Sequence, residues 1–317
     1  MSAHKSWLSL DKQKELLISR GMCAHNESSW QTALEHIGYY RLSGYWKYYQ
    51  QEPGAYGREP FIPGTSLDQI LGIYRAEQQL NSLLMPKLLE LEVYLRTRFA
   101  YECGKRSTTG DLLSGSLFVD LPREDMVYKL TSSVEGDLDR STEAYMSHYA
   151  GEQRSRDYTN LPLWIAVEAL SFGTLSRIIG ANREEIAYPL ADKLKVSRED
   201  FPGQIRAITK IRNRIAHGNR LWNVKNDSMP AVAKTWKRQS ERAGYPLRRS
   251  KKMIDSMYVD IFVLDKLHSY AGLGSFLNDE VHPLLEQNPV LKLGICDPVD
   301  MHRRADIQRF LLEHNEA

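Results

Sequence analysis

Cysteine is scarce in this 317-residue chain, which contains only Cys23, Cys103 and Cys296. Because the three residues lie far apart in the sequence, neither a disulfide framework nor a clustered zinc site is expected. The chain is long enough to bury a hydrophobic core without such cross-links. A low and scattered cysteine content is typical of a reducing compartment, so we expect a cytoplasmic location.

Signals for a membrane or for strands are also lacking. The N-terminal residues, MSAHKSWLSLDKQKELLISRG, have no apolar core and no small-residue cleavage site of a signal peptide. The most apolar stretch, 161–172, contains Glu168 and is too short to span a bilayer. Alternating runs of β-branched residues are absent. We therefore expect no membrane partner and an all-α fold.

Helical periodicity dominates the rest of the sequence. Apolar residues at three- and four-residue steps predict one long helix from an N-cap at 65–66 to about Cys103, with a possible kink at Pro86. A second clear helix is predicted over 201–217, with Gly218 as its C-terminal stop. Residues 104–122 resemble a loop, and Thr174 is expected to cap a short helix. Shorter helices are predicted over 10–20, 123–150, 161–171, 175–179, 183–195, 228–242, 253–270 and 300–314.

These patterns suggest three parts. We expect an aromatic-rich N-terminal segment over 1–60, a helical domain over 61–250 and a C-terminal helical extension over 251–317. Trp164 and Phe172 are expected to pack in the core of the helical domain.

Charge is distributed unevenly along the chain, although the net charge is only +2. Residues 204–252 contain 14 Lys and Arg against two acidic residues, so this block carries +12 and the remainder −10. A basic block of this kind predicts a polyanionic partner, most commonly nucleic acid. A solvated basic face without a partner is the alternative, and charge alone does not decide between them.

The segment Arg212-Asn213-Arg214-Ile215-Ala216-His217 lies inside this block, at the end of a predicted helix. Asn213 and His217 are four residues apart and share a helix face, so the amide is expected to orient the imidazole. Arg212 lies about 140° around the helix from His217, but its side chain is long enough to reach a phosphate near the helix end. The negative end of the helix dipole favours a protonated histidine there.

These side chains suit the cleavage of RNA, which supplies its own nucleophile, the 2′-OH. A histidine serves as base or acid and a guanidinium stabilises charge on the phosphorane, so neither a metal nor a cofactor is required. The expected products are a 2′,3′-cyclic phosphate and a 5′-OH. Because one helix supplies one histidine, a symmetric homodimer is expected to complete the site. The same spacing also fits a histidine that caps its own helix and an arginine paired with a carboxylate.

Several segments resemble a known group of proteins. RNRIAHGNRLWN (212–223) is similar to the Arg-Asn-x-x-x-His signature of the HEPN superfamily of helical ribonucleases. Three further segments resemble the abortive-infection Abi family of the AbiD/AbiF type: YYRLSGYWKYY (39–49), IYRAEQQLNSLLMPKLLELEVYLRTRFAY (73–101) and PLWIAVEALSFGTLSRI (162–178).

The resemblance implies an HEPN-like helical bundle with additional N- and C-terminal helices. It implies a toxin-like bacterial protein of phage defence that cleaves RNA as a homodimer, with a regulatory non-coding RNA as a possible second partner. Carried onto this chain, the catalytic positions are Arg212, Asn213 and His217. HEPN toxins silenced by AMPylation carry tyrosine two residues after the histidine, and this chain has Asn219 there, so that control is not implied.

Further basic residues are candidate RNA contacts. Arg41 lies among Tyr39, Tyr45 and Trp46, where an aromatic core cluster is the favoured interpretation. For Arg96, an ion pair with Glu92 or Glu102 is an equal alternative. Residues 234–252, with Trp236 and Tyr245, are a possible extension of the RNA track. The full set of candidate contacts is Lys210, Arg214, Arg220, Arg41 and Arg96.

A non-catalytic module that holds a partner non-coding RNA remains the alternative to a ribonuclease. DNA is not expected as a partner.

Overall fold

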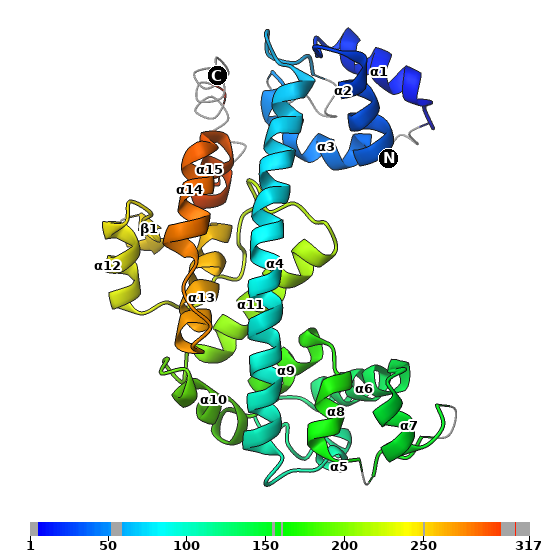
Figure 1. Ribbon diagram of the computed structural model, residues 1–317, viewed down its shortest axis with the longest axis vertical. Helices are drawn as coiled ribbons and strands as arrows, with labels where there is room; N and C mark the ends of the chain where they lie inside the picture. Colours follow the sequence, from blue (N-terminus) through cyan, green and yellow to red (C-terminus); the bar gives the residue numbers. More distant parts are fainter. Residues whose placement is uncertain are drawn as a thin grey trace. The chain divides into compact units, whose positions relative to one another are not determined.

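A computed structural model describes residues 6–51, 59–153, 156–159, 161–249, 251–298 and 308. In this part of the chain the regular secondary structure is almost entirely helical (Figure 1). Its strands form one two-stranded antiparallel hairpin, in which β1 (Arg248–Arg249) pairs with β2 (Lys252–Met253). The predicted all-α fold is confirmed. The helix predicted over 300–314 lies outside the described residues, except for residue 308.

The chain divides into two compact units. Unit 1 comprises 1–83, 220–225 and 279–317, and unit 2 comprises 84–219 and 226–278. The long helix α4 (Leu67–Cys103) supplies its first half to unit 1 and its second half to unit 2. The domain boundaries expected near 60 and 250 stay a prediction.

Unit 1 contains short helices and the first half of α4. The predicted helix over 10–20 is confirmed as α1. Two helices after residue 281 were not anticipated; their prolines stand in the first turn, where a helix accommodates them. The helical elements are α1 (Leu10–Ser19), α2 (Glu27–Gln31), a π-helical turn (Thr32–Ile37), α3 (Tyr39–Trp46), a 3-10 turn (Lys47–Tyr49), α14 (His282–Gln287) and α15 (Pro289–Cys296).

Unit 2 holds the second half of α4, and within it α11 (Phe201–Ala216) contacts α9 (Phe172–Ala181) and α13 (Met257–Tyr270) (Figure 1). A further π-helical turn, Leu277–Val281, follows α13 and spans the sequence boundary of the two units. The helical elements of unit 2 are α5 (Thr109–Ser114), α6 (Glu124–Arg140), α7 (Ala144–Ala150), α8 (Leu163–Ala169), α9 (Phe172–Ala181), a π-helical turn (Arg183–Ala187), α10 (Tyr188–Lys193), α11 (Phe201–Ala216), α12 (Lys234–Arg242) and α13 (Met257–Tyr270).

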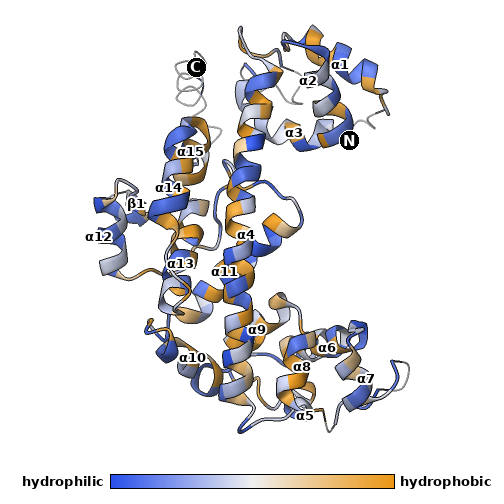
Figure 2. Cartoon of the chain, viewed as in Figure 1, coloured by the Kyte–Doolittle hydropathy of each residue, from blue (hydrophilic) through white to orange (hydrophobic). Residues whose placement is uncertain are grey.

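The long helix α4 agrees with its prediction because its start is set locally. The Ser66 hydroxyl accepts from the Gln69 amide at 3.2 Å, and the Gln69 side chain accepts from the Ser66 amide at 2.8 Å. This reciprocal pair satisfies two backbone donors of the first turn. The helix continues through Pro86 without a break. Figure 2 shows hydrophobic and hydrophilic positions alternating along it, as in a helix with one buried face.

Several local predictions in unit 2 were wrong. Helix α5 lies within the expected loop, because Thr108 and Asp111 form a capping box that starts a helix there. Helix α9 begins at Phe172 rather than 175, since the Ser171 hydroxyl, not Thr174, caps it. Phe172 is buried as predicted, but Trp164 is 54% exposed and is not a core residue. In the described part of the chain, no helix combines the length and apolarity needed to cross a bilayer.

Candidate active site

The candidate catalytic segment ends α11 in unit 2. Gly218 has a φ of 62°, in the left-handed region that favours glycine. The Asn219 amide donates to the Arg214 carbonyl at 2.7 Å, and the Gly218 amide donates to the Ile215 carbonyl at 2.9 Å. These two bonds form a Schellman motif and confirm the predicted glycine stop. His217 is the C-cap residue and is exposed to solvent.

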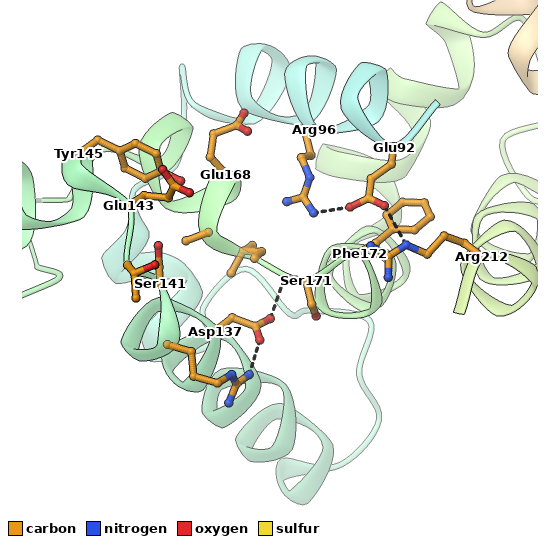
Figure 3. Close-up of a pocket in the computed structure, with 14 residues that line it drawn as sticks. Glu92, Arg96, Asp137, Ser141, Glu143, Tyr145, Glu168, Ser171, Phe172 and Arg212 are labelled. Carbon is orange, nitrogen blue, oxygen red and sulfur yellow. Dashed lines mark hydrogen bonds and ion pairs between the residues drawn. The ribbon is translucent and has the colours of Figure 1, made fainter. Parts of the chain in front are cut away.

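Arg212 takes part in a charged cluster with two residues of α4 (Figure 3). Its Nε lies 3.2 Å from Glu92 Oε2, while Arg96 Nη2 lies 2.6 Å from Glu92 Oε1. Arg96 also donates to the Val167 carbonyl at 2.7 Å. The Glu92 side chain is only 7% exposed, so one buried carboxylate neutralises one of two guanidinium groups. The cluster therefore keeps a charge of +1, and the ion pair that the sequence allowed between Arg96 and Glu92 is present.

The remaining nitrogen of Arg212 decides whether this residue can also bind an anion. Nη1 donates to Asn213 Oδ1 at 3.1 Å, and Nε faces Glu92. Nη2 has no protein partner among the described residues, and the side chain is 27% exposed. Arg212 can thus keep its ion pair and still offer one nitrogen to a phosphate oxygen.

Asn213 orients a different group from the one expected. Its side-chain oxygen accepts from Arg212, and none of the hydrogen bonds in the described structure joins its amide to His217. The neighbouring guanidinium competes for the same oxygen and offers the stronger, charged donor. The predicted Asn213–His217 bond is therefore wrong for this structure, and Asn213 holds the arginine instead.

A pocket of about 420 Å³ opens beside Arg212 and Arg96. Its other walls come from the end of α6, the segment before α7 with the first turn of α7, and the junction of α8 with α9 (Figure 3). At that junction Asp137 binds the Ser171 amide at 2.9 Å and Arg140 at 2.5 Å. These bonds hold the pKa of Asp137 below its ordinary value, although burial opposes them. The carboxylate therefore stays ionised and fixes the start of α9 at the pocket wall.

Lys210, two residues before Arg212, contacts α13. Its Nζ lies 3.0 Å from Asp260 Oδ2 and donates to the Asn226 side chain and to the Ser228 carbonyl. Asp260 is fully buried, and this burial raises its pKa to about 6 although Lys210 acts in the opposite direction. A phosphate contact by Lys210 would compete with this pair. Arg214, in the last turn of α11, is half-buried.

Arg220 belongs to unit 1, where its guanidinium donates to the Gly44 carbonyl. It also lies over the rings of Tyr45 and Tyr48, 5.7 and 6.0 Å from their centroids. Tyr45 itself is buried in the aromatic cluster that the sequence favoured. Arg41, on the same helix α3, is exposed.

Glu77 of α4 connects α3 with residues 221–222, and the sequence analysis did not identify it. Its side chain is fully buried and accepts from the Tyr45 hydroxyl and from the amides of Leu221 and Trp222. Burial raises the pKa of this carboxyl, whereas its hydrogen bonds and Arg220 lower it. One signal was available: Glu77 is four residues after Ile73 and three before Leu80, on the apolar stripe of α4.

Two aromatic residues of the segment 234–252, which the sequence suggested as an extension of the RNA contacts, lie in the core. Trp236 and Tyr245 are buried, and their rings contact Phe262 and Tyr258 of α13, respectively. Because these faces are covered by protein, they are not available for stacking on nucleic acid bases. The positive charge of 234–252 remains, without those aromatic platforms.

Comparison with known proteins identifies the family. A family profile described as Abi-like protein matches residues 32–223, a range that includes α3, α4 and the whole of α11. No curated protein and no solved structure gave a match. Since the family match covers more than half of the chain, this chain belongs to the Abi-like protein family.

Proposed function

We propose that this chain is a metal-independent endoribonuclease of a bacterial abortive-infection system. One observation carries the proposal: the end of α11, a helix within the range that the family profile matches, bears both His217 and Arg212. His217 is exposed, and one nitrogen of Arg212 has no partner among the described residues. Membership of the Abi-like family suggests a role in phage defence. HEPN-type chemistry and RNA as the substrate are proposed from the Arg-x4-His site.

The proposed reaction is an internal transesterification of RNA. One His217 removes the proton of the 2′-OH, and the 2′-oxygen attacks the adjacent phosphorus. The P–O5′ bond breaks, and the leaving 5′-oxygen takes a proton from a second histidine. Arg212 Nη2 donates to a non-bridging oxygen as negative charge grows on the phosphorane. The products are a 2′,3′-cyclic phosphate and a 5′-OH.

This scheme uses two histidines, and each chain offers one in the motif. In the alternative scheme one histidine removes the proton while two arginines bind the phosphate, which also needs two copies. We therefore propose that two copies related by a twofold axis bring two α11 ends together. His217 of one copy then acts as the base and His217 of the other copy as the acid. Asn213 is a positioning residue in this scheme, because it contacts the guanidinium rather than the imidazole.

The proposal is tested with purified protein and single-stranded RNA in the presence of EDTA. We expect cleavage that leaves cyclic phosphate ends, and its loss in His217→Ala with an unchanged circular dichroism spectrum. Arg212→Lys should reduce the rate strongly, since lysine cannot reproduce the fork between Glu92, Asn213 and a phosphate. His36→Ala, at an exposed histidine of unit 1, is the matched control. Undiminished cleavage by His217→Ala would refute the catalytic assignment.

A second candidate is a non-catalytic module that holds a partner non-coding RNA. The ion pair between Arg212 and Glu92 favours it, because a structural role for this arginine needs no substrate. Salt-sensitive RNA binding without any cleavage, in wild type and in His217→Ala alike, would support this candidate.

A further inference from the structure

The pocket beside Arg212 has two chemically different ends. Arg212 and its ion-pair partner Glu92 lie at one end, and Glu143 and Tyr145 lie at the other (Figure 3). Arg96, which shares Glu92 with Arg212, and Glu168 lie on the wall between the two ends. The pocket has a volume of about 420 Å³, opens widely to solvent and is lined mainly by polar groups. The pocket therefore matches a ligand with an anionic group at one end and hydrogen-bond donors at the other.

The carboxylates of Glu143 and Glu168 can accept hydrogen bonds from a ligand. Glu143 and Glu168 are both exposed, and none of the ion pairs in the described structure involves them. Burial raises the pKa of the Tyr145 hydroxyl, and the charges of Glu143 and Glu168 raise it further, whereas a hydrogen bond with Ser141 and the charge of Arg96 lower it. The tyrosine is half-buried and offers an aromatic face beside the two carboxylates.

Among the RNA bases, guanine fits such an end best. Its Watson–Crick edge presents two adjacent donors, N1–H and the 2-amino group, which one carboxylate can accept together. Adenine and cytosine present one amino group beside an acceptor nitrogen, which an ionised carboxylate repels. Uracil presents a single N–H between two carbonyl oxygens. Aromatic side chains stack on any base, so Tyr145 adds affinity and the carboxylates add selectivity.

We infer that this pocket holds the guanine of the RNA nucleotide next to the scissile phosphate, with the Glu143/Glu168 pair as its acceptor and Arg212 on the phosphate. The inference rests on the proposed ribonuclease function and specifies its substrate. It predicts cleavage beside guanosines and makes Glu143, Glu168 and Tyr145 specificity residues, without a part in proton transfer.

Binding of a single nucleotide tests the pocket without requiring cleavage. Guanosine 3′-monophosphate carries both features of the ligand and is measured by titration calorimetry against its adenosine and inosine counterparts. We expect the adenosine nucleotide to bind at least about tenfold more weakly, and the inosine nucleotide, which lacks the 2-amino group, to lie between them. The double variant Glu143→Gln/Glu168→Gln should lose this preference, and Tyr145→Leu should weaken all three nucleotides. Glu184→Gln, an exposed glutamate outside the pocket, is the matched control.

The base preference of cleavage then separates this inference from the proposed function. RNAs with one guanosine, inosine or adenosine in a uridine background should be cut beside guanosine by wild type and without preference by the double glutamine variant. Cleavage without base preference by wild type, or an unchanged preference in the double variant, would overturn the inference and leave the nuclease proposal standing. Guanosine nucleotide binding without any RNA cleavage would overturn both the nuclease proposal and the role of the pocket as a substrate subsite. Equal binding of the three nucleotides, or none, would overturn the pocket assignment itself.

Discussion

Replacing Glu77 by alanine removes a buried carboxylate on which three segments of unit 1 depend. Three donors would lose their acceptor: the Tyr45 hydroxyl and the backbone amides of Leu221 and Trp222. A buried donor without a partner costs about 1–3 kcal/mol, so three donors cost about 3–9 kcal/mol. Removing a desolvated carboxylate, whose pKa burial raises, offsets part of this cost. We expect unit 1 to lose about 3–6 kcal/mol of unfolding free energy.

The isosteric change Glu77→Gln is the comparison that isolates these hydrogen bonds. The amide oxygen can still accept from Leu221 and Trp222, and the amide nitrogen can donate to the Tyr45 hydroxyl oxygen. The negative charge near Arg220 and the acceptor of the Tyr45 hydroxyl proton are lost, whereas both backbone amides keep theirs, so we expect a cost of about 1–3 kcal/mol. Glu15→Ala, on the exposed face of α1, should change stability by less than about 0.5 kcal/mol.

Urea unfolding followed by tryptophan fluorescence measures these differences, because Trp222 is fully buried and stacks on Tyr45 with centroids 5.7 Å apart. The chain contains six tryptophans, so the fluorescence transition includes both units and is compared with the circular dichroism of the whole chain. A loss below about 1 kcal/mol in Glu77→Ala would refute the hydrogen-bond argument. Equal losses in the alanine and glutamine variants would refute it as well, since only the former removes every acceptor.

Three further predictions concern unit 2 and the assembly. Because burial raises the pKa of Asp260 from 3.8 to about 6, the folded state keeps a proton that the unfolded state releases between these values. The unfolding free energy of wild type relative to Asp260→Asn should therefore fall by about 2 kcal/mol as the pH rises from about 4 to about 7. A difference independent of pH in urea titrations would contradict this. Gly218→Ala should cost about 1–2 kcal/mol in thermal unfolding because of its positive φ, whereas Gly72→Ala, within α4 and with open space at its Cβ, should not destabilise the protein. If two copies of His217 complete the site, specific nuclease activity should drop on dilution as sedimentation shows monomers, and a fully active monomer would exclude the shared site.

Local patterns predicted the long helices well and the short elements poorly. Helix α11 was placed within a residue of its observed end, because its apolar stripe is long and its stop depends on a neighbouring glycine. The junction of α8 and α9 was misplaced, since Ser171 and Thr174 are both capable caps and the sequence does not rank them. Trp164 was expected in the core, yet exposure of an aromatic side chain depends on which distant segment covers it.

The sequence by itself determined the helical class and the end of α11 at Gly218, because both depend on interactions between residues three to five positions apart. It also placed Arg212 and His217 on the same helix. Only the tertiary structure decided what these side chains contact. Arg212 pairs with Glu92 and Lys210 pairs with Asp260, and both acids lie far away in the sequence. Asn213 accepts a hydrogen bond from the guanidinium of Arg212 and, in the described part of the chain, makes none with the imidazole of His217. Helical periodicity shows which face of a helix is buried, but the partner of a buried charge is set by the packing of segments that are distant in the chain.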